Sequence, residues 1–358
     1  MFDQELNGFD QYRRVRVIRL SPMENRHIIV TGEAEMVRQS LKLFALAIAG
    51  LMLRGVANAQ DISGLAAEPV AGIIQEFAID NSERMTVQVQ VNGSTAVPFI
   101  VDTGSERTVI ANDLAKRLLL ESGPRLTLAT ISGKFEVNSF FIDRLTTSAV
   151  NLVALEAPGL ERSNLGAYGL LGIDSLEDNR VLLDFAKQTM DVLPSPKGKK
   201  RNKLENGMIV VTAKRQAGRM IISSARIEGM RVDIILDTGA QSSMGNDALR
   251  DKLRRRHRTI DYIPVRMRSV TGSVLMGEFT QIKEIEIGGL TINDLPMTFA
   301  DNYAFTALGL QDRPAILLGM DALRLFDRVM IDFGNRRVGF DLPSGVERKS
   351  FTRFASAE

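Results

Sequence analysis

The chain has 358 residues, of which 44% are hydrophobic and 25% charged, with a formal net charge of +2; these values exclude a mainly disordered chain and fit a two-domain or bilobal globular protein. Because it contains no cysteine, disulfides, a thiolate nucleophile and cysteine-ligated metal centres are excluded. His27 and His257 are the only imidazoles, which argues against a serine–histidine triad or a histidine-rich metal site and leaves carboxylates as the main chemical groups.

Residues 36–59 have the pattern of a signal peptide, with basic Arg38 and Lys42, an apolar run of about a dozen residues and a small-residue end, Ala57-Asn58-Ala59. The apolar run is shorter than the roughly 20 residues that span a bilayer. We therefore expect an exported protein, periplasmic or secreted, that begins near Gln60 and has no stable membrane insertion. Residues 1–35 are then an upstream extension without a folding role.

Removal of residues 1–59 would take away eight basic and six acidic side chains, which leaves 37 of each. The expected mature chain is therefore close to neutral, and no general attraction to nucleic acid or to an anionic membrane follows. Residues 60–76 are interpreted as either a loose leader or a removable pro-segment.

The rest of the chain is an internal repeat. Two segments, 85–104 and 220–239, each end in Asp-Thr-Gly, and a methionine precedes the aspartate by 17 residues in both. Farther on, "LLGID" at 170–174 matches "LLGMD" at 317–321, and the strand-like run 181–193 matches 329–342. The repeat predicts two homologous lobes, residues 77–193 and 208–345, with a C-terminal tail at 346–358.

The segment between the lobes, residues 194–207, holds two prolines, two glycines and five basic residues, which indicates a solvated linker rather than a recognition patch. Short helices are expected at 112–119 and 246–255, each opening with an Asn-Asp pair suited to a helix N-terminus. Most other segments alternate between apolar and polar residues, as at 283–292, so the fold is predicted to be mainly β.

Two Asp-Thr-Gly turns on lobes related by approximate twofold symmetry can bring two carboxyl groups together. An aspartate at the end of an apolar strand needs partners, and the glycine N–H and threonine hydroxyl that follow it can supply them. Two carboxyls about 3 Å apart cannot both ionise, so they hold one proton between them. Such a pair can act as base toward water and as acid toward an amide carbonyl, without metal or cofactor.

With these motifs the sequence resembles the aspartic peptidases of the retropepsin and pepsin clan. "DTGSERTVI" at 102–110 resembles the retropepsin triplet region, and "LLGID" and "LLGMD" resemble that clan's apolar-apolar-glycine signature. The resemblance covers roughly residues 77–193 and 207–342 and implies two β-barrel lobes with a cleft between them. It further implies that Asp102 and Asp237 are catalytic. Thr103 and Thr238 would interlock the two loops, and Gly104 and Gly239 would direct backbone N–H groups to the carboxylates. Ser105 and Ala240 would occupy the small-residue positions next to the aspartates, and Gly172 and Gly319 would support the loops from behind.

The expected flaps depart from the pepsin pattern. Segments 127–137 and 267–279 contain no tyrosine, but each has a glycine at an expected hairpin tip, which is more like the paired flaps of a retropepsin dimer. Apolar residues near them (Ile131, Phe135, Val274, Leu275, Met276) are interpreted either as substrate pockets or as packing of the flaps on the body. The possible flap and substrate-binding residues are Ile131, Ser132, Gly133, Thr271, Gly272 and Ser273.

The sequence thus predicts an aspartic endopeptidase that acts on peptide or protein substrates, needs no cofactor or metal, and works as a monomer with both lobes in one chain. The alternative is an exported, non-catalytic peptide-binding protein that retains the fold. Both aspartates are present, which argues against a decayed enzyme without excluding the binding protein.

Overall fold

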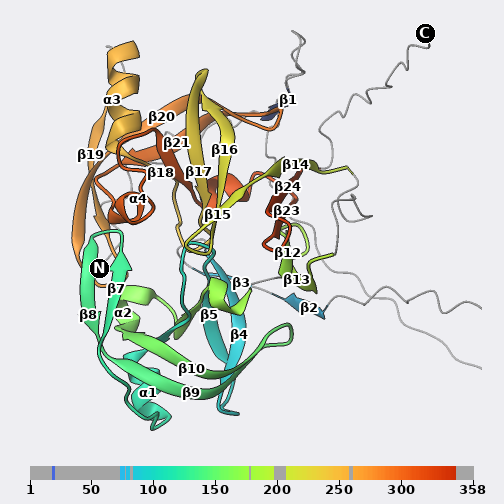
Figure 1. The fold of residues 1–358 in the computed structure, drawn as a ribbon, viewed down its shortest axis with the longest axis vertical. Coiled ribbons are helices and arrows are strands. Elements are labelled where there is room, and N and C mark those ends of the chain that lie inside the picture. Colours follow the sequence, from blue (N-terminus) through green and yellow to red (C-terminus); the bar gives the residue numbers. More distant parts are fainter. Residues whose placement is uncertain are drawn as a thin grey trace, which may run out of the picture.

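The computed structural model describes residues 18–20, 73–76, 78–80, 84–176, 179–196, 207–257 and 261–343. The predicted signal peptide, most of the linker and the C-terminal tail lie outside these residues. Figure 1 shows a lower lobe coloured cyan to green, an upper lobe coloured yellow to orange, and a smaller sheet at their side.

The first lobe is a seven-stranded sheet in the order β3-β4-β5-β11-β6-β10-β9, and an additional pairing of β4 with β9 curls it toward a barrel. A separate hairpin, β7–β8, projects from it. Its elements are β3 (Ala78–Ile79), β4 (Met85–Val91), β5 (Val97–Val101), β6 (Val109–Ala111), α1 (Asn112–Arg117), β7 (Leu126–Thr130), β8 (Gly133–Val137), β9 (Ser139–Thr146), β10 (Asn151–Leu160), α2 (Arg162–Leu165), β11 (Gly169–Leu171) and the 3-10 helix η2 (Ile173–Ser175).

The second lobe is a nine-stranded sheet in the order β1-β21-β18-β22-β17-β16-β20-β19, with β15 beside β16 and an additional β20–β21 pairing. Its first strand, β1 (Ile18–Leu20), comes from the segment expected to have no folding role, and pairs with residues 290–292. The other elements are β15 (Lys214–Gln216), β16 (Arg219–Ile227), β17 (Met230–Leu236), β18 (Met244–Gly245), α3 (Asp247–Arg256), β19 (Ile263–Arg268), β20 (Val274–Ile287), β21 (Leu290–Phe299), α4 (Tyr303–Ala307), β22 (Ala315–Leu318) and α5 (Met320–Leu323).

The repeat in the sequence is also a repeat in topology. In the first lobe β11 runs parallel to β5 and antiparallel to β6, and in the second lobe β22 runs parallel to β17 and antiparallel to β18. Likewise β10 is parallel to β6, as β21 is to β18. The fold is therefore mainly β with two equivalent barrel-like lobes, as predicted.

A six-stranded sheet joins the two lobes, in the order β14-β24-β23-β12-β13-β2. At its centre β12 and β23, the two strands of the sequence repeat, pair antiparallel with Leu182 opposite Met330. These two side chains pack with Met208 in a small buried cluster. The strands are β2 (Ile73–Glu76), β12 (Asn179–Asp184), β13 (Thr189–Pro194), β14 (Ile209–Thr212), β23 (Arg328–Asp332) and β24 (Arg337–Asp341).

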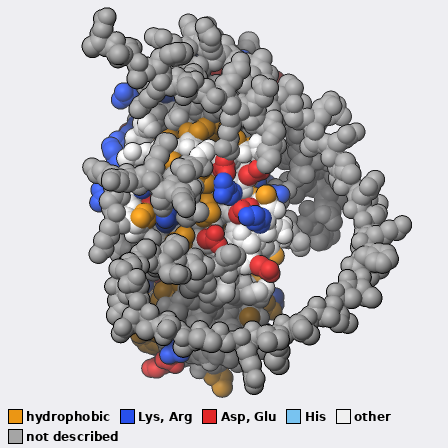
Figure 2. All heavy atoms as spheres, turned by 90° about the vertical axis from the view of Figure 1, so that its right-hand side faces the viewer, with side chains coloured by type: hydrophobic (Ala, Val, Ile, Leu, Met, Phe, Trp, Pro, Cys, Tyr) orange, Lys and Arg blue, Asp and Glu red, His pale blue; other side chains and the backbone are white. Residues whose placement is uncertain are grey.

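The strands form because apolar side chains alternate along them. On β4, Met85, Val87, Val89 and Val91 point into the core, and the polar residues between them include exposed Gln88 and Gln90. Seen from the right of Figure 1, the described side chains include acidic and basic groups close together, with hydrophobic ones between them (Figure 2). Within the described residues, no helix combines the length and the apolarity that crossing a membrane requires.

Both expected helices are present, but their starts differ. Asn246 caps α3, because its side chain accepts a hydrogen bond from the Leu249 N–H. In α1 the cap residue is Ala111 without a side-chain bond, and Asn112 is already helical. The Asn-Asp pair therefore opens α1 as expected, with Asn112 as its first residue, and the Asn112 amide donates to Glu161 beside α2 at 2.7 Å.

Candidate active site

The two Asp-Thr-Gly loops follow equivalent strands and meet between the lobes. Asp102 comes directly after β5 and Asp237 directly after β17. Each aspartate N–H donates to the last residue of the neighbouring parallel strand, Asp102 to Leu171 O at 3.0 Å and Asp237 to Leu318 O at 3.1 Å. Both loops are therefore held by the same backbone geometry.

Thr103 and Thr238 interlock the loops. The Thr103 hydroxyl donates to Leu236 O at 3.1 Å, and the Thr238 hydroxyl donates to Val101 O at 2.7 Å. Each hydroxyl also accepts the other threonine's N–H, at 3.0 and 3.1 Å. Both side chains are fully buried, so these four bonds replace contacts with water that folding removes.

The glycines of the two triplets allow the carboxyls to approach. Gly104 N–H donates to Asp102 Oδ1 at 2.7 Å, and Gly239 N–H donates to Asp237 Oδ1 at 3.0 Å. A β-carbon on Gly104 would lie 2.5 Å from Asp237 Cγ, and one on Gly239 would lie 2.3 Å from Asp102 Cγ. Each glycine therefore packs on the acid of the opposite lobe, where a larger residue does not fit.

Asp102 and Asp237 lie close enough at the crossing of the two loops for each carboxyl to affect the pKa of the other. Burial, and after it the charge of Asp237, raises the pKa of Asp102 to about 8. Burial also raises the pKa of Asp237, but the Arg219 charge, the hydrogen bond from Asp102 and two backbone N–H groups oppose that rise. One proton on the pair, carried mainly by Asp102, is the protonation state that these surroundings favour.

The surroundings of the two acids differ in two ways. Ala240 N–H gives Asp237 Oδ1 a second backbone donor at 3.0 Å, whereas the N–H of Ser105, its counterpart, lies 3.4 Å from the main-chain oxygen of Asp102. Arg219 reaches across from β16, donating from Nε to Gly104 O at 2.6 Å and pairing with Glu106 at 3.0 Å. Its side chain is only 11% exposed, and our sequence reasoning missed it.

Gly172 and Gly319 lie directly behind the loops. Gly172 N–H donates to Thr108 Oγ1 at 3.2 Å and Gly319 N–H to Ser243 Oγ at 3.1 Å. A β-carbon on either glycine would lie 2.5 to 2.7 Å from main-chain carbon of the loop in front, Arg107 C or Ser242 C. Both glycines therefore mark a contact of backbone on backbone.

The aspartates of "LLGID" and "LLGMD" have a positioning role that sequence reasoning missed. Asp174 accepts the Thr108 N–H and hydroxyl at 2.8 and 2.7 Å. Asp321 accepts the Ser243 N–H at 3.1 Å and its hydroxyl at 2.6 Å. The signal was present, because the repeat preserves an acid after each glycine together with a hydroxyl residue six positions after each triplet aspartate.

The two expected flaps are hairpins whose tips contact the opposite lobe. In the first, Ile131 and Ser132 form the turn between β7 and β8, and Gly133 opens β8. Ile131 O accepts the Tyr303 N–H of α4 at 2.9 Å, and Lys134 Nζ lies 5.9 Å from the centre of the Tyr303 ring. Figure 1 shows this hairpin reaching up toward the second lobe, where β7 contacts α4.

The second flap is the β19–β20 hairpin, with Thr271, Gly272 and Ser273 at its end. Gly272 packs on α2 of the first lobe, because a β-carbon there would lie 2.9 Å from Asn164 Nδ2. Thr271 and Phe135 both line a cavity of about 270 Å³ between the two flaps and the end of β10. Each flap therefore rests on the short helix of the other lobe.

The apolar flap residues divide between two environments. Phe135 and Leu275 are half-buried, whereas Val274 and Met276 are 47% and 59% exposed. Val274 and Met276 pair across the hairpin with Arg268 and Arg266, on its outer face. They are therefore neither pocket residues nor body packing in this closed arrangement.

Two similar β-barrel lobes with interlocked Asp-Thr-Gly loops between them define a bilobal acid protease fold. Comparison with protein families agrees for each lobe: residues 223–322 match the family described as aspartyl protease, and residues 87–178 match the gag-polyprotein putative aspartyl proteases. No curated protein matches the chain. The chain belongs to the aspartyl proteases of the retropepsin type, with two such domains in one chain.

Proposed function

We propose that the protein is an aspartic endopeptidase that uses Asp102 and Asp237 as its catalytic pair. The observation that carries this proposal is the pair of neighbouring carboxyls, each fixed by N–H groups of its own loop and packed against the glycine of the other. No role in folding requires two half-buried acids to lie side by side, since each raises the other's cost of ionisation.

The different surroundings support a distinct role for each acid. Asp237, with two backbone donors and the stronger influence of Arg219, is the ionised member and takes a proton from a water as that water attacks the amide carbonyl. Asp102 holds the shared proton and donates it to the carbonyl oxygen. The resulting tetrahedral diol collapses when Asp237 gives its proton to the amide nitrogen and the now ionised Asp102 takes a proton from one diol hydroxyl. The C–N bond breaks, a carboxylic acid and an amine leave, and the pair again holds one proton on Asp102.

The test is hydrolysis of a diverse peptide mixture by the parent and by Asp102→Asn, Asp237→Asn and the double variant, between pH 3 and pH 9. We expect each single variant to lose nearly all turnover and the double variant to be little worse, because the two acids act as one unit. A folded Asp237→Asn protein with near-normal turnover contradicts the pair. A parent that binds peptides tightly but cuts none favours the peptide-binding alternative.

We further propose that the active species is a monomer, since both triplets lie on one chain. Specific activity should then be independent of protein concentration in a range where sedimentation reports only monomer. Activity that rises with the dimer fraction overturns this.

Export is likewise a proposal, supported by the sequence of residues 36–59. The protein recovered from cells should begin at or near Gln60. N-terminal analysis that finds residues 36–59 retained on a cytoplasmic protein contradicts it.

A further inference from the structure

A second pocket lies along β15, β16 and β17 of the second lobe, and the proposed peptidase mechanism does not use its polar side chains. Its volume is about 390 Å³. Arg231, on its wall, precedes Asp237 by six residues of extended chain, a span on the order of 20 Å, whereas Ile221 at the other end of the pocket lies opposite Ile235, two residues before Asp237. The polar side chains lining it are three cations and three hydroxyls with no acid among them: Lys214, Arg226, Arg231, Thr212, Ser223 and Ser224.

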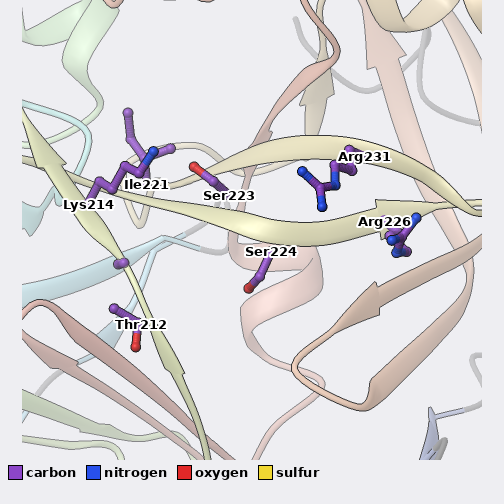
Figure 3. Close-up of a pocket in the computed structure, with 8 residues that line it drawn as sticks. Thr212, Lys214, Ile221, Ser223, Ser224, Arg226 and Arg231 are labelled. Carbon is purple, nitrogen blue, oxygen red and sulfur yellow. The ribbon is translucent and has the colours of Figure 1, made fainter. Parts of the chain in front are cut away.

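The strand register explains why these side chains gather. Lys214 on β15 lies opposite Ile221 on β16, and Arg226 on β16 lies opposite Arg231 on β17. Between those points the β16–β17 register shifts, so Ser223 and Ser224 sit in a β-bulge. Figure 3 shows Arg231 extending from β17 back toward this bulge. Bulges re-aim side chains, and here two hydroxyls reach the same pocket as the cations.

Two arginines directly opposite each other are unfavourable without an anion. Like charges at a cross-strand pair destabilise a sheet, and Glu286, the partner of Arg226 on β20, forms no ion pair with it within the described chain. Arg226 donates one hydrogen bond, to Gly229 O at 2.8 Å. The side chains of Lys214, Ser223, Ser224 and Arg231 have no hydrogen-bond or ion-pair partner among the described residues, and all but Ser223 are exposed. Arg84, Arg219 and Arg328 each pair with an acid.

We propose that this pocket binds a phosphate group, carried by a small soluble molecule or by a lipid headgroup. Guanidinium groups match the oxygens of a phosphate through paired N–H donors, and they do so more strongly than neutral donors. A lysine and two bulge hydroxyls supply further donors. The volume lies within the usual range for small-molecule sites.

The first measurement titrates the full chain with inorganic phosphate by calorimetry at constant ionic strength. We expect Arg226→Gln/Arg231→Gln to weaken binding about tenfold or more, because it removes both charge-assisted donors. The matched control is Lys116→Gln/Arg144→Gln, which removes two exposed positive charges from the first lobe and should bind as the parent does.

Thermal unfolding checks that the variants fold. Arg231→Gln alone should unfold at a higher temperature than the parent in phosphate-free buffer, because it removes the like-charge pair. Phosphate should raise the unfolding temperature of the parent and of the control by the same amount, and that of Arg226→Gln/Arg231→Gln by clearly less.

The source of the phosphate is decided by a second probe, co-sedimentation with phosphatidylcholine vesicles that do or do not contain phosphatidic acid. Binding of inorganic phosphate that the pocket variant loses indicates a soluble ligand. Binding only to phosphatidic acid vesicles, again lost in the pocket variant and kept in the control, indicates a headgroup. The proposal is overturned if the parent binds neither probe, or if the pocket and control variants lose binding equally.

Discussion

Gly239 lies against the carboxyl group of Asp102, and a β-carbon on this glycine would come within 2.3 Å of Asp102 Cγ. Gly104 stands in the same relation to Asp237, at 2.5 Å. Non-bonded carbon atoms do not approach this closely, so a side chain at either position has to displace the opposite carboxyl. Each loop therefore sets where the acid of the other lobe sits.

Gly239→Ala should lower kcat/KM on the order of a hundredfold, because displacement of a reacting group by about 1 Å has an effect of that size. The control is Gly93→Ala, where φ is +76° and nothing lies within 4 Å of the added carbon. That change should cost about 1–2 kcal/mol of stability through backbone strain and leave turnover unaltered. Similar kinetics for the two variants contradict the crowding argument.

Thr238→Val should reduce the free energy of unfolding by about 2–4 kcal/mol, because it leaves Val101 O and the Thr103 N–H buried without partners. Thr86→Val is the comparison, since Thr86 is also buried but makes one hydroxyl bond, to Ala78 O at 3.2 Å. Denaturant unfolding should rank Thr238→Val as clearly the more damaging. Equal losses would mean that the interlocked hydroxyls add nothing beyond their own packing.

The raised pKa of Asp102 predicts how stability changes with pH. The folded pKa, about 8, exceeds the unfolded value, about 4, so the folded state binds more protons between these limits and stability falls as pH rises through them. Asp102→Asn should therefore be more stable than the parent at pH 7–8, with the difference shrinking toward pH 4. Asp312→Asn, at an exposed site, should run parallel to the parent. A pH-independent gap between parent and Asp102→Asn refutes the shift.

The contact of the first flap with α4 can be removed at a single N–H. Tyr303 is the first residue of α4, a position where proline is tolerated, and Asn302 before it is already extended. Tyr303→Pro deletes the donor to Ile131 O, whereas Tyr303→Ala keeps it and loses only the ring. Loss of one hydrogen bond, about 1 kcal/mol, predicts roughly fivefold faster hydrogen exchange in residues 126–137.

The exchange should be faster in Tyr303→Pro than in Tyr303→Ala. If the alanine variant exchanges as fast as the proline variant, the ring and its contact with Lys134, rather than the N–H, hold the flap.

The sequence was sufficient for the features that depend on local chemistry. A particular backbone geometry is needed at the triplets, at the glycines behind them and at the hairpin tips. Glycine, threonine or a strand–turn pattern in the sequence indicates that geometry. The repeat identified Gly172 and Gly319 as an equivalent pair, and the resemblance to the aspartic peptidases implied that they back the loops. Gly133 was predicted at a tip and lies one residue beyond the turn, within the usual uncertainty of element ends.

The features that escaped prediction depend on partners distant in the chain. Nothing near Arg219 in sequence indicates that it crosses to Gly104, 115 positions away. Nor does the sequence of β12 indicate that its neighbour is its own repeat, β23. The pairing of residues 73–76 with β13, inside the segment interpreted as a leader or pro-segment, is of the same kind. Long-range contacts and strand pairings of this kind follow from the packing of the whole chain.

The central pairing of β12 with β23 has a consequence for any separated half. If the chain were cut in the linker, β12 in one half and β23 in the other would each expose unpaired N–H and C=O groups along one edge. An open strand edge of this kind pairs readily with another chain. Association of the two halves would depend on their concentration, and pairing of two identical halves would compete with the correct pairing. The covalent connection keeps the two halves at a high effective concentration, so the pairing of β12 with β23 does not depend on the concentration of the protein.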